Sequence, residues 1–202
     1  MKITSTLLTF LILSFSTYAI SPGKTAPSFE LKNEKGKIIK LENLKGQYVI
    51  LEWFNHGCPF VRKHYDSNNM QMTQSKAIKT LGDKKVTWLS INSSAKNKQG
   101  HLANPNEASV KLKEEKSNAT HMLLDSDGKV GQAYGAKTTP QMVIIGPSGI
   151  VLYNGAIDSI ASANQNDIKA AKNYILNAVK SIKNGEKVSP SKTKPYGCSV
   201  KY

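Results

Sequence analysis

The feature that most constrains this chain is an apolar run, YVILEWF at residues 48–54, followed closely by a cysteine and a proline. The run predicts a buried β-strand, and Pro59 suits the first turn of a helix because its missing N–H would have no helical partner there. Unpaired backbone amides and the helix dipole stabilise a thiolate at such a helix N-terminus. We therefore expect Cys58 to be a nucleophile, with Arg62 one turn along adding positive potential. A buried, inert thiol is the alternative.

Strand and helix patterns alternate along the rest of the chain, with no internal repeat. We predict two short strands around a turn at Gly36, further strands at 86–91 and 121–124, and a hairpin over 138–157. Helices are predicted over 59–81, with a pause at 66–69, over 105–116, and in a short segment that ends at 134–135. A last helix is predicted to bury one face, formed by Ile168, Ala171, Ile175, Val179 and Ile182. This order predicts one α/β domain at residues 20–185, with a mixed central sheet flanked by helices. Residues 186–202 have no hydrophobic period and are predicted to form an irregular C-terminal tail on the surface.

The first 19 residues have the pattern of a secretory signal peptide. Lys2 precedes the apolar stretch LLTFLIL, and a small-residue motif ends at Ala19, where cleavage is expected. Stable membrane insertion is not expected, because a membrane helix needs roughly 20 apolar residues; a retained anchor is the alternative. Export would place the protein in the periplasm or outside the cell.

The chain is strongly basic, with a formal net charge of +14. Arg62 is its one arginine, and the lysines are spread along the sequence. Nucleic-acid-binding proteins usually cluster their basic residues and use the arginine fork to contact phosphates and bases. We therefore expect a solvated, lysine-rich surface and no nucleic-acid partner.

The second of the two cysteines, Cys198, lies in the predicted tail. A thiolate that meets a peroxide becomes a sulfenic acid, and a second thiol condenses with it to a disulfide. A mobile tail is well suited to deliver that thiol, so Cys198 is expected to resolve the sulfenic acid, within the chain or from a second subunit. A permanent structural bridge to Cys58, or a bridge to another chain, remains open because exported proteins favour disulfides.

Several segments resemble, in order, the peroxiredoxin-like branch of the thioredoxin-fold superfamily, the alkyl hydroperoxide reductase and thiol-specific antioxidant (redoxin) proteins. They are GKTAPSFELKNEKGK, the Cys58-Pro59 junction, LLDSDGKVGQAYGAKTTP and VIIGPSGIVLYNGAID. The resemblance covers about residues 22 to 183. It implies a thioredoxin-like fold, a reactive Cys58 and oxidoreductase activity.

The resemblance also implies supporting site residues. Peroxiredoxins carry Pro-x-x-x-Thr-x-x-Cys, in which the threonine helps to position the peroxide; here Leu51 and Asn55 stand at the proline and threonine positions, and Asn55 is left to donate that hydrogen bond. Glu52 matches a buried acid that accepts a proton near the cysteines of thioredoxin-like proteins, the alternative being a strand residue paired with a lysine. Thr139-Pro140 matches the cis-proline that packs against the active cysteine, the alternative being a trans proline that opens a strand.

Two histidines, His56 and His64, flank Cys58 and raise the question of a metal site. Copper-delivery relatives of the fold usually present two close cysteines and a distant histidine, whereas this motif has a single cysteine. We therefore expect no metal and no cofactor. The distant arginine that peroxiredoxins use is also absent, which leaves a lysine or Arg62 to substitute for it.

These features predict an exported, thiol-dependent redox enzyme in which Cys58 attacks a hydroperoxide and Cys198 resolves the product. Two alternatives stay open: a thiol-disulfide oxidoreductase acting on envelope proteins, and a non-enzymatic thioredoxin-fold module with a structural Cys58–Cys198 disulfide. The expected partners are a hydroperoxide or protein disulfide substrate and a thioredoxin-like reductant, with an oligomer as a further option.

Overall fold

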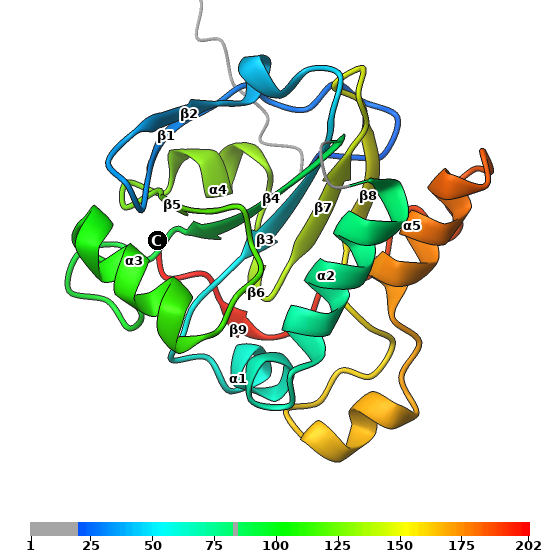
Figure 1. Cartoon of the computed structure of the whole chain (residues 1–202). Coiled ribbons are helices and arrows are strands. Elements are labelled where there is room, and N and C mark those ends of the chain that lie inside the picture. Colours follow the sequence, from blue (N-terminus) through cyan, green and yellow to red (C-terminus); the bar gives the residue numbers. More distant parts are fainter. Residues whose placement is uncertain (1–19, 83–84) are drawn as a thin grey trace, which may run out of the picture.

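A computed structural model of the chain describes residues 20–82 and 85–202 (Figure 1). The predicted signal peptide lies outside the described residues. The strands are β1 (Glu30–Asn33), β2 (Ile38–Lys40), β3 (Tyr48–Trp53), β4 (Val86–Asn92), β5 (His121–Leu124), β6 (Thr138–Thr139), β7 (Met142–Ile145), β8 (Val151–Gly155) and β9 (Cys198–Ser199). The helices are α1 (Pro59–Asp66), α2 (Asn69–Leu81), α3 (Pro105–Glu114), α4 (Lys129–Ala133) and α5 (Tyr174–Lys183), with two 3-10 helices, η1 (Leu41–Leu44) and η3 (Gln165–Lys169).

Seven strands form the central sheet, in the order β2-β1-β5-β4-β3-β7-β8. Strand β4 pairs in parallel with β3 and β5, whereas β7 is antiparallel to both β3 and β8, and β1 is antiparallel to β2 and β5. The predicted mixed sheet is therefore confirmed. Because β3 is an interior strand, the loop that leads from its C-terminal end to Cys58 begins at the middle of that end of the sheet.

The sheet is covered on both faces, which explains why the predicted strand at β3 is apolar along its whole length. Successive side chains of a strand point to opposite faces. Ile50 packs on one face with residues of α1, α2 and α5, and Leu51 packs on the other face with residues of α4. Figure 1 shows α2 and α5 side by side on the first face and α4 across the sheet from them. Glu52, two residues after Ile50, consequently faces the side that carries α1.

The last helix begins later than its hydrophobic pattern predicts. Asn173 caps α5, its side chain accepting a hydrogen bond from the Leu176 N–H, so Ile168 and Ala171 lie outside the helix. Ile168 belongs instead to η3, which has no buried residue. The hydrophobic spacing continues past Asn173 toward the N-terminus, so the spacing alone does not show that the helix begins at this N-cap.

The C-terminal tail is docked rather than free on the surface. It crosses the molecule between α1 and the ends of the central strands, where its strand β9 pairs antiparallel with β6 (Figure 1). The backbone N–H of Val200 donates to the Lys137 carbonyl at 3.0 Å, and that of Ala95 donates to the Lys201 carbonyl at 2.7 Å. The prediction that this tail is mobile is therefore wrong. Tertiary contacts order the segment although its sequence has no hydrophobic period.

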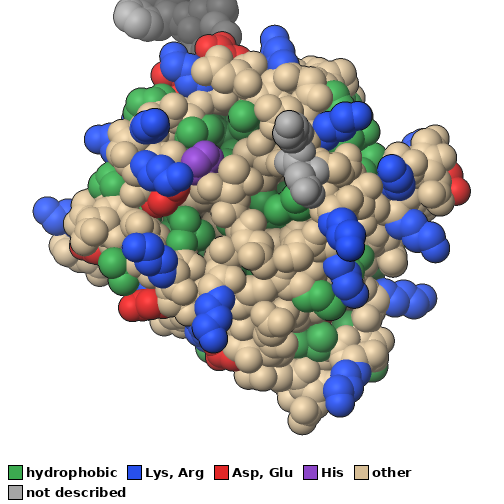
Figure 2. Space-filling model, viewed as in Figure 1, with side chains coloured by type: hydrophobic (Ala, Val, Ile, Leu, Met, Phe, Trp, Pro, Cys, Tyr) green, Lys and Arg blue, Asp and Glu red, His purple; other side chains and the backbone are tan. Residues whose placement is uncertain are grey.

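The outer surface carries most of the positive charge. Figure 2 shows lysine side chains dispersed over the visible face, with no dense basic cluster. Among the described residues, no helix combines the length and the apolar character that crossing a membrane requires.

Candidate functional site

The first candidate residue, Cys58, occupies the position that its sequence neighbours predict. It is the N-cap of α1, with an extended backbone at φ −88° and ψ 122°, and Pro59 is the first helical residue. The loop that delivers it from β3 is a turn in which the Asn55 carbonyl accepts from the Cys58 N–H at 3.1 Å. The side chain is 0% exposed, and its Sγ donates to the Thr139 carbonyl oxygen at 3.1 Å.

The second cysteine is brought to the same place from the far end of the chain. Cys198 opens β9, and in the β6–β9 pair it lies opposite Thr139, the residue whose carbonyl accepts from Cys58. Its half-buried side chain packs against the same core cluster as Cys58. Both cysteines are free thiols, and they lie close enough for each to shift the pKa of the other. The structure therefore joins the two cysteines that the sequence placed at opposite ends of the domain.

The two thiols have different acidities. Burial raises the pKa of Cys58, but nearby groups that stabilise the thiolate outweigh it, so the pKa is lowered; they are the side chains of Cys198 and Thr139 and the backbone amides of Cys198 and Val61. Burial and the neighbouring Cys58 raise the pKa of Cys198 to about 11. Cys58 is consequently the thiol that ionises first, while Cys198 stays protonated beside it.

Thr139 contributes a second group to this contact. Its peptide bond to Pro140 is cis, as predicted. The Thr139 hydroxyl is buried and has no hydrogen-bond partner among the residues described, while the Cys58 thiol donates to the carbonyl of the same residue. Because a thiolate accepts hydrogen bonds and donates none, the free hydroxyl can donate to the sulfur once Cys58 ionises, and this stabilisation of the thiolate lowers the pKa.

Glu52 is fully buried beneath this region, and among the described residues none of its hydrogen-bond partners is a lysine. Its carboxylate accepts from the Tyr65 hydroxyl and the Trp88 indole N–H, each at 2.8 Å, from Ser90 at 3.1 Å and from Gln74 at 3.3 Å. Burial raises its pKa, and these four hydrogen bonds oppose the shift. The alternative of an ion-paired strand residue is therefore wrong, and a buried acid is present at the predicted position.

Asn55, which stands at the threonine position of the peroxiredoxin motif, is used to build the loop. Its Oδ1 accepts from the Gly57 N–H at 2.9 Å, and its Nδ2 donates to the Gln99 carbonyl at 3.0 Å. Gly100 packs so closely that a β-carbon there would lie 2.1 Å from the Asn55 Oδ1. The side chain is 1% exposed, so these loop contacts engage the amide that was expected to bind substrate.

Arg62 turns toward carboxylates on its own side of α1. Its guanidinium forms ion pairs with Glu115 and Asp66, so two negative charges offset the positive potential expected at Cys58. His64 is fully buried and bonds to Asn69, and its pKa is lowered to about 4, mainly by burial. Within residues 20–82 and 85–202, no group of three histidine, cysteine, aspartate or glutamate side chains is placed to hold a metal ion.

The sequence did not point to a buried polar cluster beside the cysteines, formed by Lys63, His64, Asp158 and Tyr196. The Lys63 side chain is 0% exposed and pairs with Asp158 at 3.2 Å, whereas its sequence suggested a solvated lysine. One signal was available: Lys63 lies three residues after Phe60 and so shares its helix face. Both contact the ring of Tyr196, which no local pattern connects to α1.

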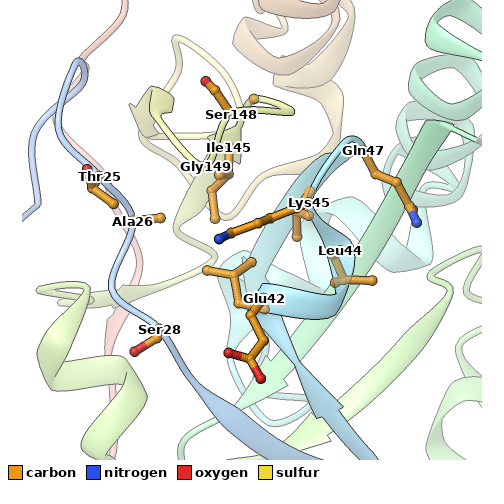
Figure 3. A pocket seen from close by; sticks show the side chains of 13 residues that line it. Thr25, Ala26, Ser28, Glu42, Leu44, Lys45, Gln47, Ile145, Ser148 and Gly149 are labelled. Carbon is orange, nitrogen blue, oxygen red and sulfur yellow. The ribbon is translucent and has the colours of Figure 1, made fainter.

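A separate hollow of about 310 Å³ lies at the other end of the sheet. It is lined by Val49 at the start of β3 and by Ile145 at the end of β7, and Figure 3 shows the Lys45 side chain extending into it. Cys58 follows the opposite end of β3, and no cysteine lines this hollow. It is therefore distinct from the thiol site.

Comparisons with known proteins agree with this arrangement. The model of the AhpC/TSA family matches residues 22–154. No curated protein matches the chain. One similar solved structure is an uncharacterized conserved protein from Geobacillus kaustophilus, which is 24% identical and aligns over 90% of this chain and 92% of that chain with a TM-score of 0.71. Another is a hypothetical protein from Sinorhizobium meliloti 1021, which is 18% identical and aligns over 92% of this chain and 96% of that chain with a TM-score of 0.70. The thioredoxin domain of a thiol-disulfide oxidoreductase from Bacteroides vulgatus is 20% identical and aligns over 75% of this chain and 97% of that chain with a TM-score of 0.52. This match identifies the fold as thioredoxin-like.

Proposed function

Because this chain belongs to the AhpC/TSA family and is a thioredoxin-fold oxidoreductase, we propose that it is an exported, peroxiredoxin-like thiol peroxidase. In this proposal Cys58 is the nucleophile and Cys198 is the resolving cysteine. Family membership favours this enzymatic role over a module that uses the two cysteines only as a structural bridge.

The observation that carries the proposal is that two free thiols lie together at the N-terminus of α1, because Cys58 donates to the Thr139 carbonyl and Cys198 pairs with that same residue in the β6–β9 ladder. The lowered pKa of Cys58 favours the thiolate, which is the nucleophilic form. The raised pKa of Cys198 keeps that thiol protonated beside it. Since Cys58 is 0% exposed and lies under the docked tail, a small oxidant fits this site better than a folded protein does.

The chemistry follows in two balanced steps. The Cys58 thiolate attacks one oxygen of a hydroperoxide; the O–O bond breaks, the alcohol or water leaves with a proton, and Cys58 becomes a sulfenic acid. The Cys198 thiol then attacks the Cys58 sulfur, the S–O bond breaks, and one water leaves as the disulfide forms. Two electrons from a dithiol donor of the thioredoxin kind return both cysteines to thiols.

Thr139 and Glu52 have supporting roles in this proposal. The unpartnered Thr139 hydroxyl donates to the Cys58 thiolate once it forms. The family motif instead places a threonine at the position of Asn55, where it helps to position the peroxide. Glu52 holds the core beneath the site through its four donors and serves as a proton acceptor. Export rests on the predicted signal peptide at residues 1–19 and implies a reductant in the same compartment.

The experiment adds one equivalent of hydrogen peroxide to the reduced protein, traps sulfenic acid with a dimedone probe and maps disulfides by mass spectrometry. Wild type is expected to form the Cys58–Cys198 bridge, and Cys198→Ser to accumulate a trapped sulfenic acid on Cys58. Cys58→Ser is the matched control and should form neither product. A wild-type protein whose thiols stay reduced under these conditions would refute the peroxidase proposal.

The docked tail also supports a second candidate function, thiol-disulfide exchange with envelope proteins. The strand β9 pairs with only two residues of β6, and Cys198 is half-buried, so a disulfide between the two cysteines would present one sulfur near the surface. Fast oxidation by a small disulfide together with inertness to peroxide would favour this function over the peroxidase.

A further inference from the structure

We propose that Tyr196 is a positioning residue for disulfide formation, and that it acts through the buried cluster of Lys63, His64, Asp158 and Tyr196, here called the tail latch. The inference rests on the proposed function, because it concerns how Cys198 is delivered to an oxidised Cys58. Its physical basis is that the latch ties the tail to the helix that begins at Cys58.

Lys63 and Asp158 form the buried centre of the latch. The Lys63 Nζ lies 3.2 Å from the Asp158 Oδ2 and donates to the Ile160 carbonyl at 3.0 Å. The two side chains are 0% and 3% exposed. A buried ion pair is costly to form unless its remaining hydrogen-bonding groups are satisfied. Here Asp158 also accepts from the Ile160 N–H at 3.0 Å, which leaves one further donor to be supplied.

The Tyr196 hydroxyl supplies that donor from the tail. It donates to the Asp158 Oδ1, lies 3.4 Å from the Lys63 Nζ and lies 3.3 Å from the His64 Nε2. The other ring nitrogen of His64 is 2.7 Å from the Asn69 amide, so the imidazole is fixed in orientation. One hydroxyl therefore meets three buried polar groups, and the latch is complete only when the tail is docked.

The Tyr196 ring also packs against side chains of α1. It packs edge-on against Phe60 with ring centroids 5.9 Å apart, and the Lys63 ammonium lies 5.4 Å from its centroid. Phe60, Lys63 and His64 all belong to α1, whose N-cap is Cys58. The tail is therefore bound to the first two turns of the helix that carries the nucleophile.

Tyr196, the latch residue in the tail, lies two residues before Cys198. Between them is Gly197, with φ +136°, where a β-carbon would lie 2.0 Å from the Thr139 carbonyl oxygen. With Tyr196 fixed on α1 and Gly197 pressed against Thr139, the chain has little freedom left before the Cys198 sulfur. Restricting a reacting group in this way raises its effective concentration.

The step that benefits is the condensation of the Cys198 thiol with the Cys58 sulfenic acid, which forms the S–S bond and releases water. The latch neither gives nor takes electrons in it. Once Cys58 is ionised, attack of its thiolate on the peroxide does not require the tail to be fixed, although Cys198 helps to keep Cys58 ionised. Loss of the Tyr196 hydroxyl should therefore slow the second step more than the first.

The test compares Tyr196→Phe with Tyr134→Phe as the matched control. Tyr134 is also buried, but its hydroxyl donates to the Pro27 carbonyl at 2.7 Å, and its ring packs with the cluster on the other face of the sheet. Stopped-flow mixing with hydrogen peroxide gives the rate at which Cys58 is consumed, and quenching with a sulfenic-acid probe gives the rate of disulfide closure.

In Tyr196→Phe we expect closure to slow about tenfold, the size expected for a lost hydrogen bond to a charged group, with more trapped sulfenic acid and a smaller change in the peroxide rate. Tyr134→Phe should change neither rate. Asp158→Asn, which keeps the size of the side chain, should also slow closure. Closure at the wild-type rate in a folded Tyr196→Phe protein would overturn the proposal, as would an equal effect in Tyr134→Phe.

A second arm separates this proposal from the proposed function. Equilibration of each protein with reduced and oxidised glutathione forms the same Cys58–Cys198 disulfide without peroxide. The effective concentration of the two thiols should fall about tenfold in Tyr196→Phe and not in Tyr134→Phe. If wild type ignores peroxide yet shows this difference, the peroxidase fails and the latch stands; an unchanged effective concentration refutes the latch.

Discussion

Replacing Glu52 with leucine or with glutamine separates the packing role of this buried acid from its charge. Leucine accepts no hydrogen bond, so the donors that face Glu52 lose their acceptor. The Trp88 indole N–H and the Tyr65 hydroxyl donate to Glu52 alone among the described residues. A buried donor left without a partner costs about 1–3 kcal/mol, so Glu52→Leu should lower the free energy of unfolding by about 2–6 kcal/mol.

Glutamine keeps one acceptor oxygen in nearly the same volume. That oxygen can retain the Trp88 N–H, and the Tyr65 hydroxyl can turn to accept from the new amide. Glu52→Gln should therefore cost less than half as much as Glu52→Leu. Urea unfolding of the reduced proteins, followed by tryptophan fluorescence, measures both values. A leucine variant within 1 kcal/mol of wild type, or a glutamine variant as unstable as leucine, would show that the hydrogen-bond reasoning is wrong.

The glutamine variant also gives the pH dependence a defined sign. Because burial raises the pKa of Glu52, the folded protein holds this proton more tightly than the unfolded chain does. At pH below the unfolded value of about 4.3, both states are protonated. As pH rises above that value, the unfolded chain ionises first, so wild type should lose stability relative to Glu52→Gln. A stability difference that is flat with pH would contradict the raised pKa.

Two further predictions concern the cysteine pair. Thiolate absorbance should titrate in two steps, because the pKa of Cys58 lies below its ordinary value and that of Cys198 is raised to about 11. The lower step should vanish in Cys58→Ser, and a single step at or above the pKa of an ordinary thiol would refute the assignment. Gly197→Ala should displace β9, because the new β-carbon would lie 2.0 Å from the Thr139 carbonyl oxygen. Hydrogen exchange at Val200 should then rise and disulfide closure should slow, whereas unchanged protection would mean that the tail tolerates the substitution.

The structure also shows why residues near Cys58 were harder to interpret than Cys58 itself. Asn55 and Arg62 are adjacent to it in sequence, yet both are engaged by distant partners, the Gln99 carbonyl and the Glu115 carboxylate. Lys63 is buried because Asp158 and the tail reach it. A residue type predicts what a side chain can bind, but its actual partner depends on which segments the fold brings near.

By itself, the sequence determined the alternation of strands and helices and the placing of Cys58 at a helix N-terminus. Both depend on local properties, since hydrophobic period and the geometry of proline act over a few residues. Only the tertiary structure decided that Cys198 lies beside Cys58 across Thr139, that the tail is held by Tyr196, and that α5 starts at its Asn173 cap. The contacts of the tail join segments far apart in the chain, and their stability comes from burial and hydrogen bonds that exist only after the sheet and helices have packed.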